Sequence, residues 1–223
     1  MMNSSKYGNV LTILLVVVIV AILGLLIYLG VDVYRKYYIE KDAKDIVDRF
    51  DEITSNLEKE DPVIEKPVGD IESPLANLND ANTSGGGGSN RVTYKGYGVL
   101  GTIKIPKTGV DYPVLERVTK KSIEVAVAYQ YGPGLNKPGN TVIIGHNYRN
   151  NMFFSNNKKL EIGDKIEIKD ETGTIVTYTI YNKYETTDSD TDYMRRDTGG
   201  AKEISLSTCT DDNARRLIIW AKE

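Results

Sequence analysis

One cysteine and one histidine are the only residues of their kinds in this 223-residue chain, and each stands at the end of a β-type run. Cys209 ends the run at 204–209 (ISLSTC), and His146 follows the apolar run at 141–145. A thiolate beside a base or cation is a strong nucleophile, and imidazole suits proton transfer near neutral pH. Together they could perform acyl transfer, with His146 protonating the leaving group. A buried structural cysteine and an ordinary strand-end histidine fit these residues as well.

Arg216 opens the next apolar run, seven residues after Cys209. A short turn could return the chain in an antiparallel pair, which would place this guanidinium beside the thiol. A fixed cation there could favour the thiolate and stabilise an oxyanion. Arg215 is its competitor, because successive strand residues face opposite sides of a sheet. Either arginine could instead be a solvated surface charge.

Composition excludes several other classes of chemistry. The formal net charge is −3, with 28 Lys and Arg against 31 Asp and Glu, so the chain has no large cationic field for nucleic acid. One cysteine allows no internal disulfide, and one cysteine with one histidine falls short of a typical zinc site. We therefore expect no metal cofactor. Asp188, Asp190 and Asp192 resemble the start of a calcium loop, but the Gly and the terminal Glu of an EF-hand are missing.

The amino-terminal part of the chain reads as a membrane anchor. After a short tail at 1–9, residues 10–31 are apolar and uncharged, and as a helix they would span roughly 33 Å. The run leads directly into charged residues, which favours an uncleaved transmembrane helix over a signal peptide or a buried core helix. Basic residues follow the span rather than precede it, so charge counting alone would place the rest of the chain in the cytoplasm.

A stalk and a linker are expected between this anchor and the globular domain. Residues 32–60 are charged with helical apolar spacing, and they could dimerise, lie on lipid or stand as a solvated stalk. Residues 61–90 contain three prolines and an SGGGGS run, a composition typical of a flexible linker. The domain then covers 91–223.

That domain is predicted to be mostly β. Short β-type runs alternate with turn residues, a pattern typical of a barrel or a sandwich. Helical signals occur at 120–129 and 150–159. The predicted strands lie at 99–105, 111–115, 141–145, 165–170, 174–184, 204–209 and 216–221.

Three motifs in this domain resemble those of the sortase family, and they occur in the family's order. Residues 206–209 (LSTC) are similar to the end of the TLxTC signature, with Ser205 in place of its first threonine. Residues 145–147 (GHN) resemble the family's histidine strand end, and 216–219 (RLII) its arginine strand. Including two early strands, the resemblance covers about 97–222.

The resemblance implies an eight-stranded β-barrel with a few short helices behind a transmembrane helix. In that family Cys209 would attack the Thr-Gly bond of an LPxTG-like sorting signal, His146 would serve as acid and base, and Arg216 would hold the carbonyl oxygen. Ser207, Thr208 and Asn147 would contact substrate. The implied partners are surface proteins with a C-terminal sorting signal and an amine from a peptidoglycan precursor or a pilin lysine.

Such chemistry requires the domain to lie on the extracellular side of the cell membrane, held there by a single-pass anchor. This requirement overrides the orientation that charge counting alone would give. Tyr112 and residues 187–194 resemble class B sortases, whereas only fourteen residues separate Met194 from Cys209, which is closer to class A or D. Two other functions remain open at this stage. A hydrolytic cysteine protease would use the same Cys209 and His146, and a non-catalytic binding module would need neither.

Overall fold

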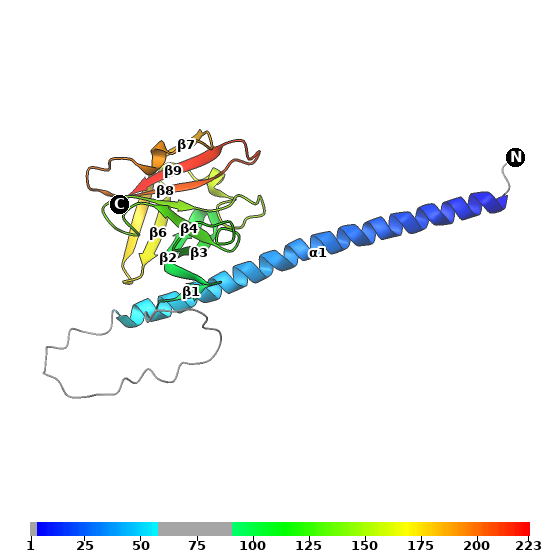
Figure 1. Cartoon of the computed structure of the whole chain (residues 1–223), viewed down its shortest axis with the longest axis horizontal. Helices are drawn as coiled ribbons and strands as arrows, with labels where there is room; N and C mark the ends of the chain where they lie inside the picture. The colour runs from blue at the N-terminus through cyan, green and yellow to red at the C-terminus, as the bar shows by residue number, and fades with distance from the viewer. Residues whose placement is uncertain (1–3, 58–90) are drawn as a thin grey trace, which may run out of the picture. The chain divides into compact units, whose positions relative to one another are not determined.

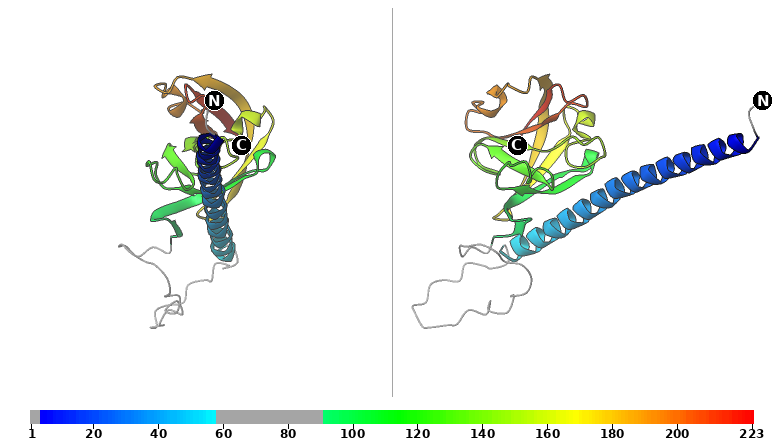
Figure 2. Two further views of the ribbon diagram at one scale, coloured as in Figure 1. Left: turned by 90° about the vertical axis from the view of Figure 1, so that its right-hand side faces the viewer. Right: turned by 45° about the vertical axis from the view of Figure 1, so that its right-hand side comes forward.

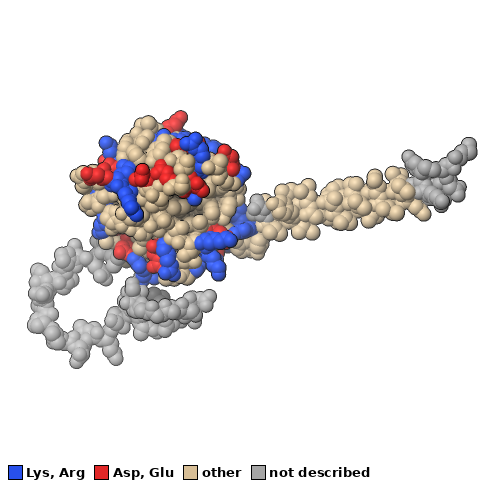
Figure 3. All heavy atoms as spheres, turned by 45° about the horizontal axis from the view of Figure 1, so that its top comes forward, with Lys and Arg blue, Asp and Glu red and all other residues tan. Residues whose placement is uncertain are grey.

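The computed structural model describes residues 4–57 and 91–223, so the predicted linker at 61–90 lies outside the described residues. The chain forms two compact units, residues 1–45 and 46–223. A single helix, α1 (Ser4–Leu57), contains both the predicted span and most of the predicted stalk. Within the described chain, α1 is the one helix long and apolar enough to cross a membrane. None of its most apolar stretch is buried, and charged side chains are absent from that stretch in Figure 3.

Eight strands of the second unit close into a barrel (Figure 1). Hydrogen-bonded neighbours follow the order β2-β3-β4-β5-β8-β9-β7-β6, and β6 pairs with β2 to complete the ring. Figure 2 shows the strands curving around a common interior from two further sides. A short extra strand, β1 (Thr93–Tyr94), pairs with β2 outside this ring. The eight strands are β2 (Tyr97–Ile105), β3 (Val110–Leu115), β4 (Val127–Tyr131), β5 (Gly139–Ile144), β6 (Lys165–Asp170), β7 (Ile175–Thr186), β8 (Lys202–Cys209) and β9 (Arg216–Lys222). The predicted eight-stranded barrel is confirmed.

Alternation along the strands produces the barrel core. Ile166 and Ile168 of β6 are fully buried, whereas the residues between and beside them reach the surface. The interior is aliphatic with a few aromatic rings, which suits the pleated surface of β-strands. Ile46 and Phe50, at the end of α1 and within the second unit, are buried in a cluster with Val92, Val99 and Leu115. Its members are buried apolar side chains from α1, β1, β2 and β3 and from the start of β4.

The predicted helix at 120–129 is wrong. Residues 120–125 form turns, and β4 follows in a parallel pair with β3 and an antiparallel pair with β5. Val127 and Ala128 are fully buried in that sheet, so the hydrogen bonds and burial of a closing strand outweigh local helical periodicity. The sequence prediction placed no strand between β3 and β5, and β4 occupies that position in the sheet.

The predicted helix at 150–159 is also wrong. It contains turns and one short 3-10 helix, η2 (Asn157–Lys159). Asn151 and Phe153 adopt φ angles of 73° and 50°, in the left-handed region that an α-helix excludes. Two further 3-10 helices complete the described short helices of the barrel unit, η1 (Pro106–Thr108) and η3 (Asp192–Met194).

Candidate active site

The cysteine and the histidine leave the barrel at the same end. β5 and β8 run parallel in register from Gly139 opposite Lys202 to Ile144 opposite Ser207. Parallel strands deliver their carboxyl ends to one edge of a sheet, so the residues that follow them emerge together. The last backbone bond between them joins the Gly145 N–H to the Ser207 carbonyl at 3.2 Å. His146 follows Gly145 directly, Cys209 lies two residues after Ser207, and both line one cavity of about 480 Å³.

Arg216 contacts the thiol from the neighbouring strand. A turn over residues 210–215 is closed by the Thr210 N–H donating to the Arg215 carbonyl at 3.0 Å. β9 then starts with Arg216 directly opposite Cys209, and its Nη1 donates to Sγ at 3.4 Å. The neighbouring Arg215 instead donates to the Glu185 carbonyl at 3.1 Å. Arg216 is therefore the arginine whose charge lies beside the sulfur.

His146 is partly buried and electrostatically suited to the neutral form. Burial lowers its pKa below the ordinary value, and Glu124 opposes that shift while the Arg216 cation adds to it. Its ring lies 4.7 Å from the Tyr148 ring, centroid to centroid, with planes 30° apart. A neutral imidazole at ordinary pH can accept a proton from a thiol or an incoming amine, which is the property that acyl transfer requires.

The loop after His146 is held at several points. The Phe154 N–H donates to the His146 carbonyl at 3.1 Å, and the Tyr148 N–H donates to Ser155 Oγ at 3.0 Å. Phe153 is fully buried at a φ of 50°, a costly conformation for an aromatic residue that persists only where packing enforces it. Its ring packs 5.0 Å from that of Tyr112. The histidine is thus presented from a fixed loop.

Ser207 and Thr208, predicted as substrate contacts, are both buried, with 1% and 2% of their surfaces exposed. Ser207 lies on the Cys209 face of β8 and accepts a hydrogen bond from Tyr193 Oη at 3.3 Å. Thr208 faces the opposite side and lines a second cavity of about 390 Å³. Its hydroxyl has no hydrogen-bond partner among the described residues. Substrate contact by either residue stays a prediction.

Asn147, the third predicted substrate contact, is bonded within the protein. Its Nδ2 donates to the Cys209 carbonyl at 3.0 Å and to Asp211 Oδ1 at 2.9 Å. Lys158 of η2 forms an ion pair with the other Asp211 oxygen, at 2.5 Å. Hydrogen bonds from Lys158 and Asn147 lower the pKa of Asp211, so it is a carboxylate at ordinary pH. Lys158 and Asp211 were not among the predicted site residues, because nothing local in the sequence connects η2 with the turn after β8.

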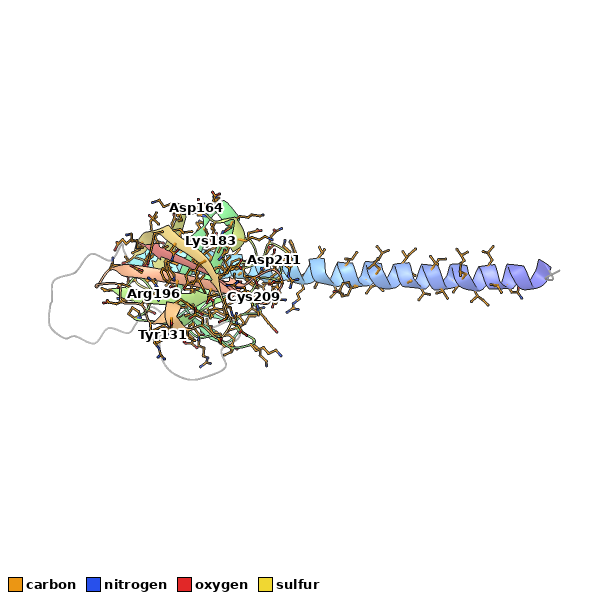
Figure 4. The ribbon with its side chains drawn as sticks, turned by 90° about the horizontal axis from the view of Figure 1, so that it is seen from above. Tyr131, Asp164, Lys183, Arg196, Cys209 and Asp211 are labelled. Atoms are coloured by element: carbon orange, nitrogen blue, oxygen red, sulfur yellow. The ribbon has the colours of Figure 1, made fainter. Side chains whose placement is uncertain are left out.

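The face of β8 that carries Cys209 continues into an apolar cluster. Val142, Ile218 and Tyr193 are buried there, and partly buried side chains extend the cluster across β5, β7, β9 and η3. The partly buried members of this cluster are Ile144, Tyr184, Met194 and Trp220. In Figure 4 Cys209 and Asp211 lie towards one end of the barrel, and Arg196 and Tyr131 towards the other.

The acidic segment 188–192 stabilises its own turn. Asp190 accepts hydrogen bonds from Thr186 Oγ1 and from the Asp192 N–H, and these bonds lower its pKa. No group of three or more His, Cys, Asp or Glu side chains could hold a metal ion within the described part of the chain. The calcium loop considered from sequence therefore gains no support from side-chain geometry.

Comparison with known proteins identifies the family. Residues 103–223, more than half of the chain, match the family model described as the Sortase domain. The chain belongs to the sortase family. A curated sortase A of Bacillus anthracis is 29% identical over 124 residues, which cover 54% of this chain and 58% of that protein. The match therefore spans little more than half of the length of that relative.

Solved sortase structures share the barrel. A sortase D5 transpeptidase of Clostridium perfringens is 32% identical, with a TM-score of 0.51 over 56% of this chain and 78% of the other. Sortase A of Corynebacterium diphtheriae is 25% identical, with a TM-score of 0.52 over 56% and 60% of the two chains. These relatives carry class A and class D names.

Proposed function

We propose that this sortase is a cysteine transpeptidase that cuts a C-terminal sorting signal and joins the new carboxyl end to an amine. The observation that carries the proposal is the convergence of three side chains from three strand ends. Cys209 and His146 line one cavity, and Arg216 Nη1 lies 3.4 Å from the sulfur. Thiol, imidazole and guanidinium are the groups that acyl transfer through a thioester needs.

In the first half-reaction, the Cys209 thiolate attacks the carbonyl carbon of the scissile Thr-Gly bond. The carbonyl oxygen gains negative charge, which the Arg216 guanidinium stabilises. His146, holding the proton taken from the thiol, donates it to the departing glycine nitrogen, and the C–N bond breaks to leave a thioester. In the second half, an amine attacks the thioester, His146 accepts its proton, and the thiolate leaves as the new amide forms.

An LPxTG-like signal suits the surroundings of Cys209. The partly buried Ile144, Tyr184 and Trp220, which pack against the buried cluster, offer apolar surface on the same face of the sheet as the sulfur. Such a surface fits the leucine and proline of the signal. The acceptor amine would come from a peptidoglycan precursor or a pilin lysine. The domain would act outside the cell membrane, with the apolar part of α1 as its single-pass anchor.

The decisive experiment incubates the full chain in detergent micelles with an LPETG peptide, with and without triglycine as the amine. Mass spectrometry then distinguishes the amide product from the hydrolysed acid. Transpeptidation predicts a ligated product that Cys209→Ala and His146→Ala abolish. Cleavage to acid that ignores the amine would instead favour a hydrolytic protease. Unchanged activity in Cys209→Ala would end the proposal.

Arg215 and Arg216 form a matched pair for testing the oxyanion role. Removing one oxyanion donor typically costs about 100- to 1000-fold in kcat, so Arg216→Ala should lose activity on that scale. Arg215→Ala removes the same charge one residue earlier, but that side chain contacts the Glu185 carbonyl rather than the sulfur. It should keep activity within about threefold. Equal losses in the two variants would refute a specific role for Arg216.

A further inference from the structure

We propose that Asn147 is a positioning residue that fixes the distance between the histidine and cysteine strand ends. This inference rests on the proposed function and adds a determinant of its rate. Asn147 stands between His146 and the loop, and its side-chain amide bonds directly to the backbone carbonyl of Cys209. It therefore joins the two catalytic segments through the Cys209 backbone rather than through the sulfur.

This side-chain bond stands where the next backbone hydrogen bond between the two strands would be. In a parallel pair, hydrogen bonds from one strand recur every two residues. After the bond from the Gly145 N–H to the Ser207 carbonyl, the next would run from the Asn147 N–H to the Cys209 carbonyl. The backbone of Asn147 instead turns away and forms an isolated antiparallel bridge with Phe153. Its side-chain Nδ2 supplies the donor to the Cys209 carbonyl, at 3.0 Å.

The amide is itself held in one orientation. Its second N–H donates to Asp211 Oδ1 at 2.9 Å, and its oxygen accepts the Arg149 N–H at 3.1 Å. Asp211 is anchored in turn by the Lys158 ammonium, which bonds its other oxygen. Both donors of the amide are thus used inside the protein. This arrangement favours a positioning role over the substrate contact predicted for Asn147 from the sequence.

The connection matters because strand pairing ends where the chemistry begins. Past Gly145 and Ser207 no backbone bond ties β5 to β8 among the described residues, yet the thiol and the imidazole follow at once. A misplacement of about 1 Å in such a pair can cost about 100-fold in rate. One side-chain hydrogen bond at the first unpaired position restrains this separation.

The test compares three variants of the full chain in the transpeptidation assay. Asn147→Ala removes the hydrogen bond to the Cys209 carbonyl. Asn147→Asp keeps the shape of the side chain but replaces the donor that faces this carbonyl with an acceptor. Both should lower kcat about 10- to 100-fold while KM changes less than about threefold, because the loss lies in the transition state. Asn156→Ala is the matched control, since among the described residues its amide bonds just the Asn151 side chain across an exposed turn. It should retain wild-type kcat.

Two further measurements separate positioning from simple loss of stability. Thermal denaturation shows whether each variant is folded at the assay temperature. In the double variant of Asp211→Ala and Asn147→Ala, the loss of kcat, expressed as activation free energy, should be smaller than the sum of the two single losses. A folded Asn147→Ala enzyme with wild-type kcat would overturn the inference. Failure of the proposed function would be visible separately, as activity that survives Cys209→Ala.

Discussion

The glycine before the histidine offers a direct test of how tightly the site is placed. A Cβ added to Gly145 would lie 2.8 Å from Phe154 Cδ2 and 2.9 Å from Val127 Cγ1. Real Cβ contacts essentially never fall below 3.0 Å. Both neighbours are fully buried, so neither can move aside without disturbing the core. Gly145→Ala must therefore shift the end of β5, and His146 with it.

Two opposing effects set the magnitude. Overpacking a core by one methyl costs about 1–3 kcal/mol, whereas replacing glycine stabilises by about 0.4–1 kcal/mol through the unfolded chain. Taken near the middle of these ranges, the two effects leave a net loss of about 1–2 kcal/mol. For a domain of this size, that loss corresponds to a fall in Tm of about 3–10 °C. Displacement of the imidazole should lower kcat about tenfold or more.

Gly98→Ala is the matched control. Its Cβ would also meet atoms at close range, 2.7 Å from Glu116 Oε2 and 3.3 Å from Arg91 Cδ, but both belong to long flexible side chains. Those side chains can rotate away, so stability should change by less than about 0.5 kcal/mol. Thermal denaturation followed by circular dichroism and the ligation assay measure both properties. Equal Tm and kcat in the two variants would refute the steric argument.

Two further predictions concern charge. Removing the cation in Arg216→Gln should raise the His146 pKa, and removing the carboxylate in Glu124→Gln should lower it. NMR titration of the single imidazole in untagged protein measures both shifts, and shifts in the opposite directions would contradict these electrostatic roles of Arg216 and Glu124. Arg196 and Glu203 form an ion pair at 2.6 Å with 13% and 11% of their side chains exposed. Arg196→Met leaves the Glu203 carboxylate without this cation, although Tyr181 Oη still donates to it, and should cost about 3–5 kcal/mol in thermal denaturation. A smaller loss in the double variant with Glu203→Met would confirm that the uncompensated charge is the cause.

The parts of the fold that the sequence predicts correctly are those where local pattern and burial agree. β6 alternates in sequence and in burial, and a polar turn separates β8, which has alternating apolar residues, from the apolar run of β9. Because that turn joins adjacent strands, Cys209 and an arginine could be expected to meet. Choosing Arg216 over Arg215 required the register across the six-residue turn, which depends on its hydrogen bonds rather than on composition.

The parts that could not be predicted depend on contacts between distant segments. β4 is only five residues long (VAYQY), and its place in the sheet is set by pairing with β3 and β5, which no local period reveals. Lys158 and Asp211 lie 53 positions apart in sequence and meet only because η2 and the turn after β8 lie at the same end of the barrel. A lysine and an aspartate at such spacing are ordinary surface residues until the fold is known.

The parallel pairing of β5 with β8 is the feature from which the geometry of the site follows. An antiparallel pair would send the residues after the two strands to opposite ends of the barrel, about six strand residues or 20 Å apart. Parallel pairing sends both to one end, and the antiparallel return of β9 adds Arg216 directly opposite Cys209. The imidazole still needs a support where the sheet ends, and Asn147 is the side chain placed to give it. A register shift of one residue between β5 and β8 would break that support and turn the sulfur to the other face, so the same pairing governs both stability and chemistry.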